Sequence, residues 1–432
     1  INENSNTITI GASGDTIALA SGASQTGFGR TGTVNWDTTK KTAGFTGVSG
    51  NGYFIDTTSG AITVNLPASP SAGDIMALAD YAGTAETNAI TVGRNGSNIE
   101  GLADNAIINI NRESKTLVFV DATQGWLPVN DNADPISNSR FVTATGGTVT
   151  TCGNFKIHTF TGPGTFCVSC AGNTVGSNTV DYMVIAGGGA GGFAPSNSGG
   201  GGGAGGYRES SGAASGCYTA SPLGACVSAL PVTASAFPIT VGAGGSTTPG
   251  AGNSGSNSIF STITSSGGGG GGAQSTPVVN GIAGGSGGGS AYCGSGSTGG
   301  AGNTPSVSPP QGNPGGSNSS GPNAAAGGGG GASAAGGAAD QTASGPGTSG
   351  PGGNGVTTSI NASPTTRAGG GGGKSLTATA TGGSGGGGAG GVAGTTNTGG
   401  GGGGGNTNPG TVPALSAGAG GSGIVIIRYK YQ

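Results

Sequence analysis

The chain has 432 residues, of which 105 are glycine, while only 7% are charged and 5% are aromatic. A net charge of −3 gives no basic stripe that could displace counterions from nucleic acid. No run of about 18 apolar residues could span a bilayer, and Ile1–Asn4 lack the features of a signal peptide. We therefore expect no nucleic-acid partner and no membrane insertion. Because residue 1 is not methionine, we expect the chain to begin inside a longer or processed product.

Residues 1–35 contain two short stretches in which apolar and polar residues alternate, Thr7–Ile10 and Thr16–Leu19, joined by a Gly-rich turn. Alternation of this kind is typical of strands with one buried face. The segment therefore predicts a stalk-like pair of short strands.

Short alternating stretches recur between residues 36 and 130 and are separated by turn signals such as Pro67–Asp74 and Arg94–Gly96. No helical period of useful length interrupts them, so the spacing predicts a β-sandwich or β-prism module. The expected strands cover residues 53–55, 61–66, 75–78, 89–92, 107–110 and 116–120.

Trp36 and Trp126 carry the largest apolar surfaces of this module, and we expect them to anchor its core. The alternative is a platform on which a sugar ring stacks. An exposed indole face would favour that alternative.

Residues 131–140 read as a linker, and residues 141–432 as a glycine-rich domain framed by strands. A flexible tail has no reason to end in a β-branched run such as Ile424–Tyr431, whereas a domain whose first and last strands pair does. The expected framing strands are 141–143, 156–160, 165–168, 181–186 and 424–431, with 156–160 and 165–168 forming a hairpin.

Uninterrupted glycine runs divide the rear of the chain, at 199–203, 267–272, 327–331, 369–373, 385–388 and 399–405. Without Cβ atoms, extended threefold helices of the polyproline II type can approach closely and bond to one another through their peptide groups. A strict Gly-X-Y repeat is missing, which excludes collagen, while a silk-like stack of sheets stays open. We expect the segments 304–326, 340–366 and 406–416 to be exposed reversals between the glycine helices, suited to binding.

Two glycine motifs resemble nucleotide sites. Gly187, Gly189 and Gly192 match GxGxxG after an apolar strand, but Phe193 and further glycine follow instead of a helix. Residues 368–375 read AxxxxGKS without the helix of a phosphate-binding loop, so Lys374 reads as a solubilising charge. We expect no cofactor at either place.

His158, the only histidine, has no evident catalytic partner, and we interpret it as a packed or edge-exposed side chain. Asp56, Asp74, Asp80 and Asp121 stand at turns or strand ends, where capping is the expected role, with a glycosidase pair as the alternative. We expect no enzyme activity and no metal.

Six cysteines occur, at positions 152, 167, 170, 217, 226 and 293. Cys217 and Cys226 flank a short Pro/Gly loop and are the first choice for a disulfide. The lone CxxC at Cys167 and Cys170 lacks the second ligand pair that a zinc site needs.

Several segments together carry a resemblance. Gly52–Gly60, Leu66–Asp74, Asn95–Ile99 and Gly125–Pro128 resemble the β modules of tail-fibre and other appendage proteins of tailed bacteriophages, especially marine ones. Asp181–Gly192, Gly202–Arg208 and Gly420–Tyr429 are similar to the glycine-rich domains attached to such fibres.

The resemblance implies an all-β virion appendage, often a homotrimer, whose polyglycine II bundle presents loops to a bacterial polysaccharide or outer-membrane protein. It also implies other tail or fibre proteins as partners and an extracellular place on the virion. No receptor-contacting residue can be transferred, because these loops differ between such proteins. The alternatives are a purely structural fibre, whisker or filament subunit and, after it, a polysaccharide depolymerase.

Overall fold

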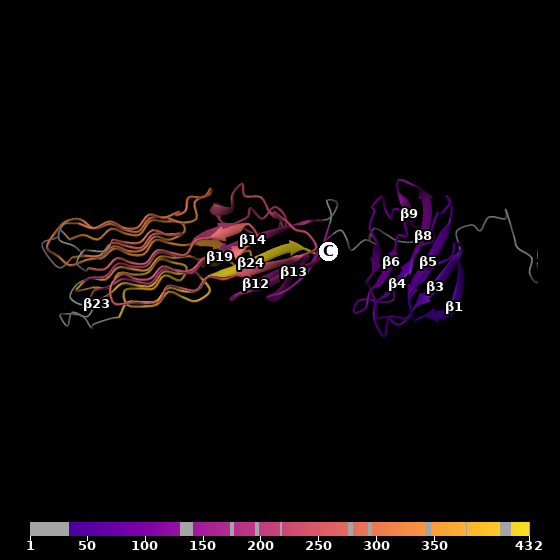
Figure 1. The fold of residues 1–432 in the computed structure, drawn as a ribbon, viewed down its shortest axis with the longest axis horizontal. Coiled ribbons are helices and arrows are strands. Elements are labelled where there is room, and N and C mark those ends of the chain that lie inside the picture. Colours follow the sequence, from indigo (N-terminus) through magenta and orange to yellow (C-terminus); the bar gives the residue numbers. More distant parts are fainter. Residues whose placement is uncertain are drawn as a thin grey trace, which may run out of the picture. The chain divides into compact units, whose positions relative to one another are not determined.

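The computed structural model is all-β, as the sequence predicts, and it divides into a first unit, Ile1–Asn138, and a second unit, Ser139–Gln432 (Figure 1). It describes residues 34–129, 141–172, 177–194, 198–216, 218–274, 280–292, 296–341, 347–376, 378–406 and 416–431. The predicted stalk strands lie outside these residues. The described residues include no helix long and apolar enough to cross a membrane.

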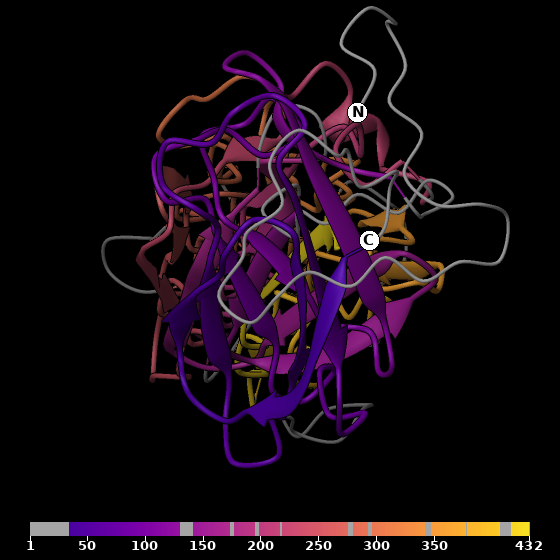
Figure 2. The same cartoon turned by 90° about the vertical axis from the view of Figure 1, so that its right-hand side faces the viewer.

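The first unit consists of two sheets, followed in indigo and purple in Figures 1 and 2. One has the order β1-β3-β5-β8-β9, and the other the order β2-β4-β6-β7. Their bounds are β1 Asn35–Lys41, β2 Phe45–Thr46, β3 Asn51–Ile55, β4 Ile62–Asn65, β5 Ile75–Asp80, β6 Ile90–Gly93, β7 Ala106–Ile108, β8 Ser114–Asp121 and β9 Gly125–Pro128.

From β1 to β6 the chain alternates between the two sheets, so that neighbours within a sheet are two strands apart in sequence. Consequently β1, β3 and β5 pair in parallel, as do β2, β4 and β6. Strands β7, β8 and β9 then pair antiparallel. This winding course differs from a hairpin-connected sandwich, and strand spacing in the sequence does not distinguish the two.

The core of the first unit lies between its sheets and includes Tyr53, Val64 and the fully buried Trp126. The prediction that Trp36 also anchors this core is wrong. Trp36 lies on β1, an edge strand, is 39% exposed, and packs against Phe54 with 4.9 Å between ring centroids. An edge strand covers its side chains from one side only, which leaves the indole partly in solvent.

The second unit begins with a sandwich. One sheet has the order β10-β13-β18-β19-β20, and the other β11-β12-β24-β14-β16, with β17 added beside β14. The bounds are β10 Val142–Thr145, β11 Thr148–Cys152, β12 Phe155–Phe160, β13 Gly164–Ala171, β14 Thr179–Ile185, β16 Tyr207–Glu209, β17 Leu230–Pro231, β18 Ala236–Thr240, β19 Ser258–Phe260, β20 Ile263–Ser265 and β24 Ile424–Lys430.

The C-terminal strand β24 pairs antiparallel with both β12 and β14, at the centre of its sheet. The expected closure of the domain by its last strand is therefore confirmed. The expected hairpin of β12 and β13 is wrong, because these strands belong to different sheets. Phe160 and Phe166, on either side of the turn, both enter the core between the sheets, and the chain crosses over to bury both rings.

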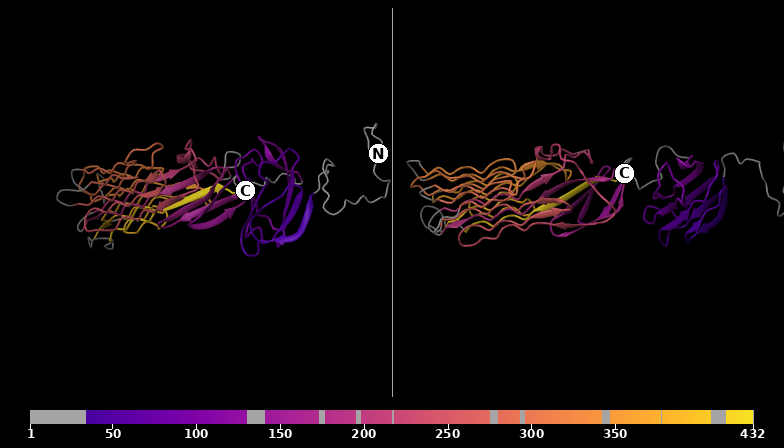
Figure 3. Two further views of the ribbon diagram at one scale, coloured as in Figure 1. Left: turned by 45° about the vertical axis from the view of Figure 1, so that its right-hand side comes forward. Right: turned by 45° about the horizontal axis from the view of Figure 1, so that its top comes forward.

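Extended glycine-rich segments continue from one end of this sandwich (Figures 1 and 3). They follow β14, β18 and β20 and precede β16, β19 and β24. We call these segments rods. Ile185 of β14 lies opposite Tyr207 of β16 and Ile424 of β24, and β18, β19 and β20 are aligned through the pairs Thr240–Ile259 and Ser258–Ser265. The sheets thus fix where the rods start and how they are spaced.

Two buried serines join the sheets at this junction. Ser258 Oγ donates to Ile185 O at 2.8 Å and accepts the N–H of Gly242, and Ser265 Oγ donates to Val184 O at 2.8 Å. These bonds satisfy carbonyl groups where the apolar core ends, which buried backbone requires.

The rods bond to one another with threefold periodicity. In the rod 199–206, successive N–H groups donate to three different rods, and every third donor returns to the same one, with N···O distances of 2.7–3.0 Å. The pairs are Gly200–Gly272, Gly201–Gly327, Gly202–Gly402, Gly203–Gly269, Ala204–Gly330 and Gly205–Gly399. A sheet would send them to two neighbours in one plane, so the silk-like alternative is excluded and packed polyproline II-like helices are confirmed.

Three corrections concern the rods. The run 385–388 was expected to be a rod, yet Gly385 and Gly386 both have φ of +96° and turn the chain. The segments 304–326 and 340–366 were expected to be reversals only. The first contains a rod in which Gly316 donates to Gly328 O. The second contains a rod through Gly353 and the hairpin β21 (Val356–Thr358) and β22 (Thr365–Arg367). One or two glycines suffice where rods touch, so run length is a poor guide.

Candidate functional site

The interior of the rod bundle has no room for side chains. A Cβ atom added at Gly201, Gly202 or Gly203 would stand closer than 3.0 Å to carbonyl groups of neighbouring rods. A ligand therefore cannot insert between these rods, and the bundle can offer only its flanks and its far end. The far end is the one opposite the sandwich.

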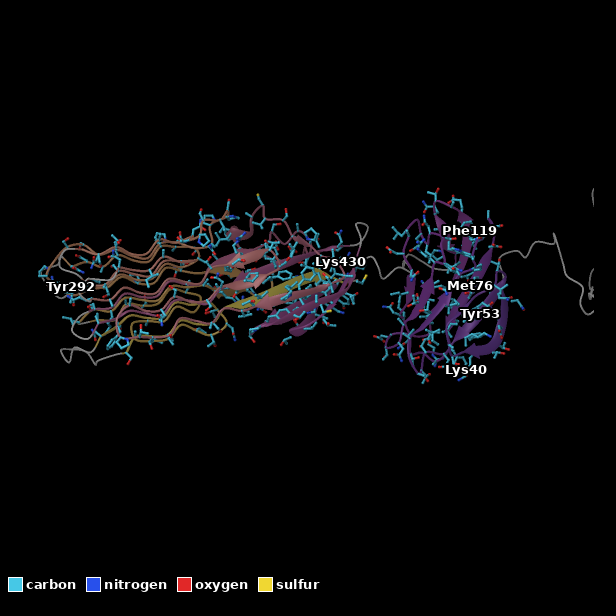
Figure 4. All side chains as sticks on the ribbon, in the orientation of Figure 1. Lys40, Tyr53, Met76, Phe119, Tyr292 and Lys430 are labelled. Carbon is cyan, nitrogen blue, oxygen red and sulfur yellow. The ribbon has the colours of Figure 1, made fainter. Side chains whose placement is uncertain are left out.

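Among the described residues, the far end carries turns between rods, such as the segment 317–326. Tyr292 lies there, at the end of the second unit opposite Lys430 (Figure 4). It is partly exposed, its N–H donates to Ser198 O at 3.1 Å, and its hydroxyl donates to Pro322 O at 3.2 Å. The short parallel pair β15 (Phe193–Ala194) and β23 (Gly405–Asn406) also joins two rods after their glycine runs.

Lys374 differs from what the sequence led us to expect. Instead of a solubilising charge, its side chain is fully buried, and Nζ has no hydrogen-bond partner among the described residues. Its backbone N–H donates to Gly199 O, and burial lowers the pKa of its ammonium group. The lysine therefore adds no positive charge to the surface.

The nucleotide-like motifs are rod segments. Gly187, Gly189 and Gly192 donate their N–H groups to Ser256, Gly203 and Gly200. In the 368–375 motif, the N–H groups of Gly369–Gly373 likewise donate to backbone carbonyl groups elsewhere in the bundle. A phosphate site needs such N–H groups free and converging on the ligand, and here neighbouring backbone already uses them.

His158 is fully buried, with Nδ1 2.7 Å from Gly146 O and Nε2 3.0 Å from the Tyr429 hydroxyl. Burial lowers the pKa of the imidazole, with the backbone bond to Gly146 opposing it, and burial raises the pKa of Tyr429 to about 12. The packed interpretation is thus confirmed.

The four aspartates accept hydrogen bonds from turn N–H groups, which confirms the capping interpretation. Asp56 accepts from Thr58, and Asp74 from Ser71. The remaining donors are Gly83, Ala85 and Arg112 for Asp80, and Thr123 and Gln124 for Asp121. Asp56 also pairs with Lys40, 2.6 Å between Oδ2 and Nζ, and this contact is the main cause that lowers its pKa to about 2.

The described residues include no group of three or more His, Cys, Asp or Glu side chains that could hold a metal. Cys167 is exposed on β13. The disulfide between Cys217 and Cys226 stays a prediction, because Cys217 lies outside the described residues.

Sequence reasoning missed a set of buried charges beside the base of the bundle. Asp181 accepts both Oγ–H groups of Ser210 and Ser215 and the N–H of Ser215, and Glu209 accepts from Tyr207, Ser221 and Thr358. Arg428, opposite Asp181 across β14 and β24, is fully buried, with its guanidinium carbon 4.8 Å and 5.3 Å from the ring centres of Phe155 and Tyr218. The only signal in the sequence was Arg428, a charged residue within the apolar run Ile424–Tyr431.

No curated protein matches this chain closely enough to count as a relative. The family described as Glycine-rich domain matches residues 161–430, a stretch that runs from the turn after β12 to the last residue of β24. It thus covers nearly all of the second unit and more than half of the chain. The chain belongs to the glycine-rich domain family.

Proposed function

We propose that this chain is a receptor-binding adhesin of a tailed bacteriophage, part of a tail fibre or similar extracellular appendage of the virion. In this proposal the rods form a stiff scaffold, and the turns at their far end contact the bacterial surface. The chain would act by binding rather than by catalysis, as a homotrimer attached to other tail or fibre proteins.

The observation that carries the proposal is that the backbone holds the bundle together, while side chains are left at its surface. The rods use their peptide N–H groups on one another, so side-chain chemistry is confined to the flanks and the far end. Exposed turns on a rigid scaffold are where binding residues commonly lie. The resemblance of both units to phage fibre segments supports the same conclusion.

The proposal is tested by adsorption of the purified full chain, fluorescently labelled, to a panel of marine bacteria in flow cytometry. We expect a subset of strains to be labelled, and excess unlabelled chain to reduce infection by a phage that carries this chain. Ser320→Arg, which adds a bulky charge at an exposed position of the far end, should abolish labelling, whereas Ser71→Arg in the first unit should not. Labelling of no strain, or equal labelling by Ser320→Arg, would contradict an adhesin.

The alternative is a purely structural fibre, whisker or filament subunit, and the same backbone bonding supports it, since it makes a rod without any receptor. A structural subunit would assemble into particles and fail to label cells, so the adsorption assay separates the two.

A further inference from the structure

The far end of the bundle is almost without charge. Beyond Glu209 the sequence has only Asp340, Arg367, Lys374, Arg428 and Lys430 as charged residues. Arg367 belongs to β22 and is buried, and Arg428 and Lys430 belong to β24 in the sandwich. Lys374 is fully buried as well. The exposed Asp340 is therefore the one charge that the bundle presents to a partner.

Among the described residues, the far end holds two partly exposed aromatic residues, Phe193 of β15 and Tyr292, and only Tyr292 carries a hydroxyl group. Between Phe260 and Tyr429 the sequence contains a single aromatic side chain, Tyr292. The rods do not need it for packing, because backbone bonds hold them together, and Tyr292 belongs to none of the three apolar core clusters.

Tyr292 is held in a defined position. Both its backbone N–H and its hydroxyl are hydrogen-bonded, to Ser198 and Pro322, while its ring stays partly exposed. Ser319 and Ser320, close in sequence to Pro322, are exposed and uncharged. A fixed, partly exposed aromatic ring is the usual make-up of an anchor at a binding surface.

We infer that Tyr292 is the aromatic anchor of a far end that binds an uncharged polysaccharide of the bacterial surface. The inference rests on the proposed adhesin function. A neutral, hydroxyl-rich polymer offers apolar sugar faces to the ring and hydroxyl groups to the serines. An anionic polymer would meet one exposed carboxylate and no exposed cation, so charge complementarity disfavours it.

The test uses the full chain and a strain labelled in the adsorption assay. We expect Tyr292→Ala to reduce binding to cells about tenfold or more, as loss of an anchor does, and Tyr81→Ala, at an exposed tyrosine of the first unit, to bind like the wild type. Tyr292→Leu keeps apolar volume without the ring and should also bind weakly. If the Tyr292→Leu variant melts at the same temperature as the wild type, its fold is intact.

Three treatments identify the partner. Raising NaCl from about 50 to 500 mM should change binding less than about twofold, because an uncharged polymer forms no ion pairs that salt could screen. Periodate oxidation of cell-surface glycans should abolish binding, and protease treatment of the cells should leave it intact.

Steep salt dependence, loss after protease, or full binding by a folded Tyr292→Leu would each overturn the inference while leaving an adhesin in place. Failure of the wild type to label any strain would instead remove the proposed function itself.

Discussion

The first unit and the rod bundle are held together by different interactions. The first unit buries large side chains such as Trp126 between two sheets and leaves the hydrogen bonds to the strands. The bundle replaces most side chains by hydrogen, so that an interior rod such as 199–206 bonds to three neighbours. In the first case burial of apolar surface drives folding, while in the second many weak hydrogen bonds between peptide groups must form together against the high entropy cost of ordering glycine.

Amide hydrogen exchange gives the largest expected contrast with ordinary glycine-rich sequence. Peptides from the rod 199–206 should exchange about a thousandfold or more slowly than a free peptide of the same sequence, because their N–H groups are bonded and buried. Exchange at the free-peptide rate, measured by mass spectrometry on the full chain, would remove the basis of the bundle.

Truncating a core side chain should harm the first unit alone. Trp126→Ala removes a fully buried indole and should cost about 3–5 kcal/mol. Calorimetry of the full chain should show a lower melting temperature for the first unit and no change for the second. A simultaneous shift of both transitions would show that the two units depend on each other.

Adding a single methyl group should harm the bundle. Gly202→Ala places a Cβ against the carbonyl of Gly189 and should cost about 1–3 kcal/mol, as overpacking does. Gly162→Ala is the matched control, because nothing lies within 4 Å of its Cβ position. If both variants melt like the wild type, close backbone packing is not what holds the rods.

The pH dependence should separate the two units further. Because burial lowers the folded-state pKa of His158 below its ordinary 6.5, the unfolded chain binds a proton that the folded chain does not. The second unit should therefore keep its full stability above pH 6.5 and lose up to about 1.4 kcal/mol per pH unit as pH falls below it. His158→Gln should flatten this slope, measured by thermal melting from pH 7.5 to 5, and an unchanged slope would assign it to other groups.

The smallest effect is expected at the surface of the first unit. Lys40→Met removes the half-exposed lysine that pairs with Asp56, while the aspartate keeps its two hydrogen bonds from Thr58, so the melting temperature of that unit should fall only slightly. A large loss would mean that this pair, rather than the core, holds the edge strand β1.

The sequence predicted most strands of the first unit and the kind of packing in the bundle, because alternation and glycine runs report directly on local geometry. In the second unit it predicted only the framing strands β10, β12, β13, β14 and β24, and it missed the shorter strands between β14 and β24. It did not predict which sheet a strand joins, as β12 and β13 show, since sheet membership depends on where distant rings such as Phe160 and Phe166 meet. It also placed Trp36 inside and Lys374 outside, because residue type alone does not reveal edge strands or inward-facing turns.

The glycines inside the bundle tolerate hardly any replacement, because an added Cβ would stand against a neighbouring carbonyl group, whereas exposed positions such as Ser319 and Ser320 can change without touching a rod. If the proposed adhesin function holds, a change of host would require new side chains at the exposed turns and no change in the glycine scaffold.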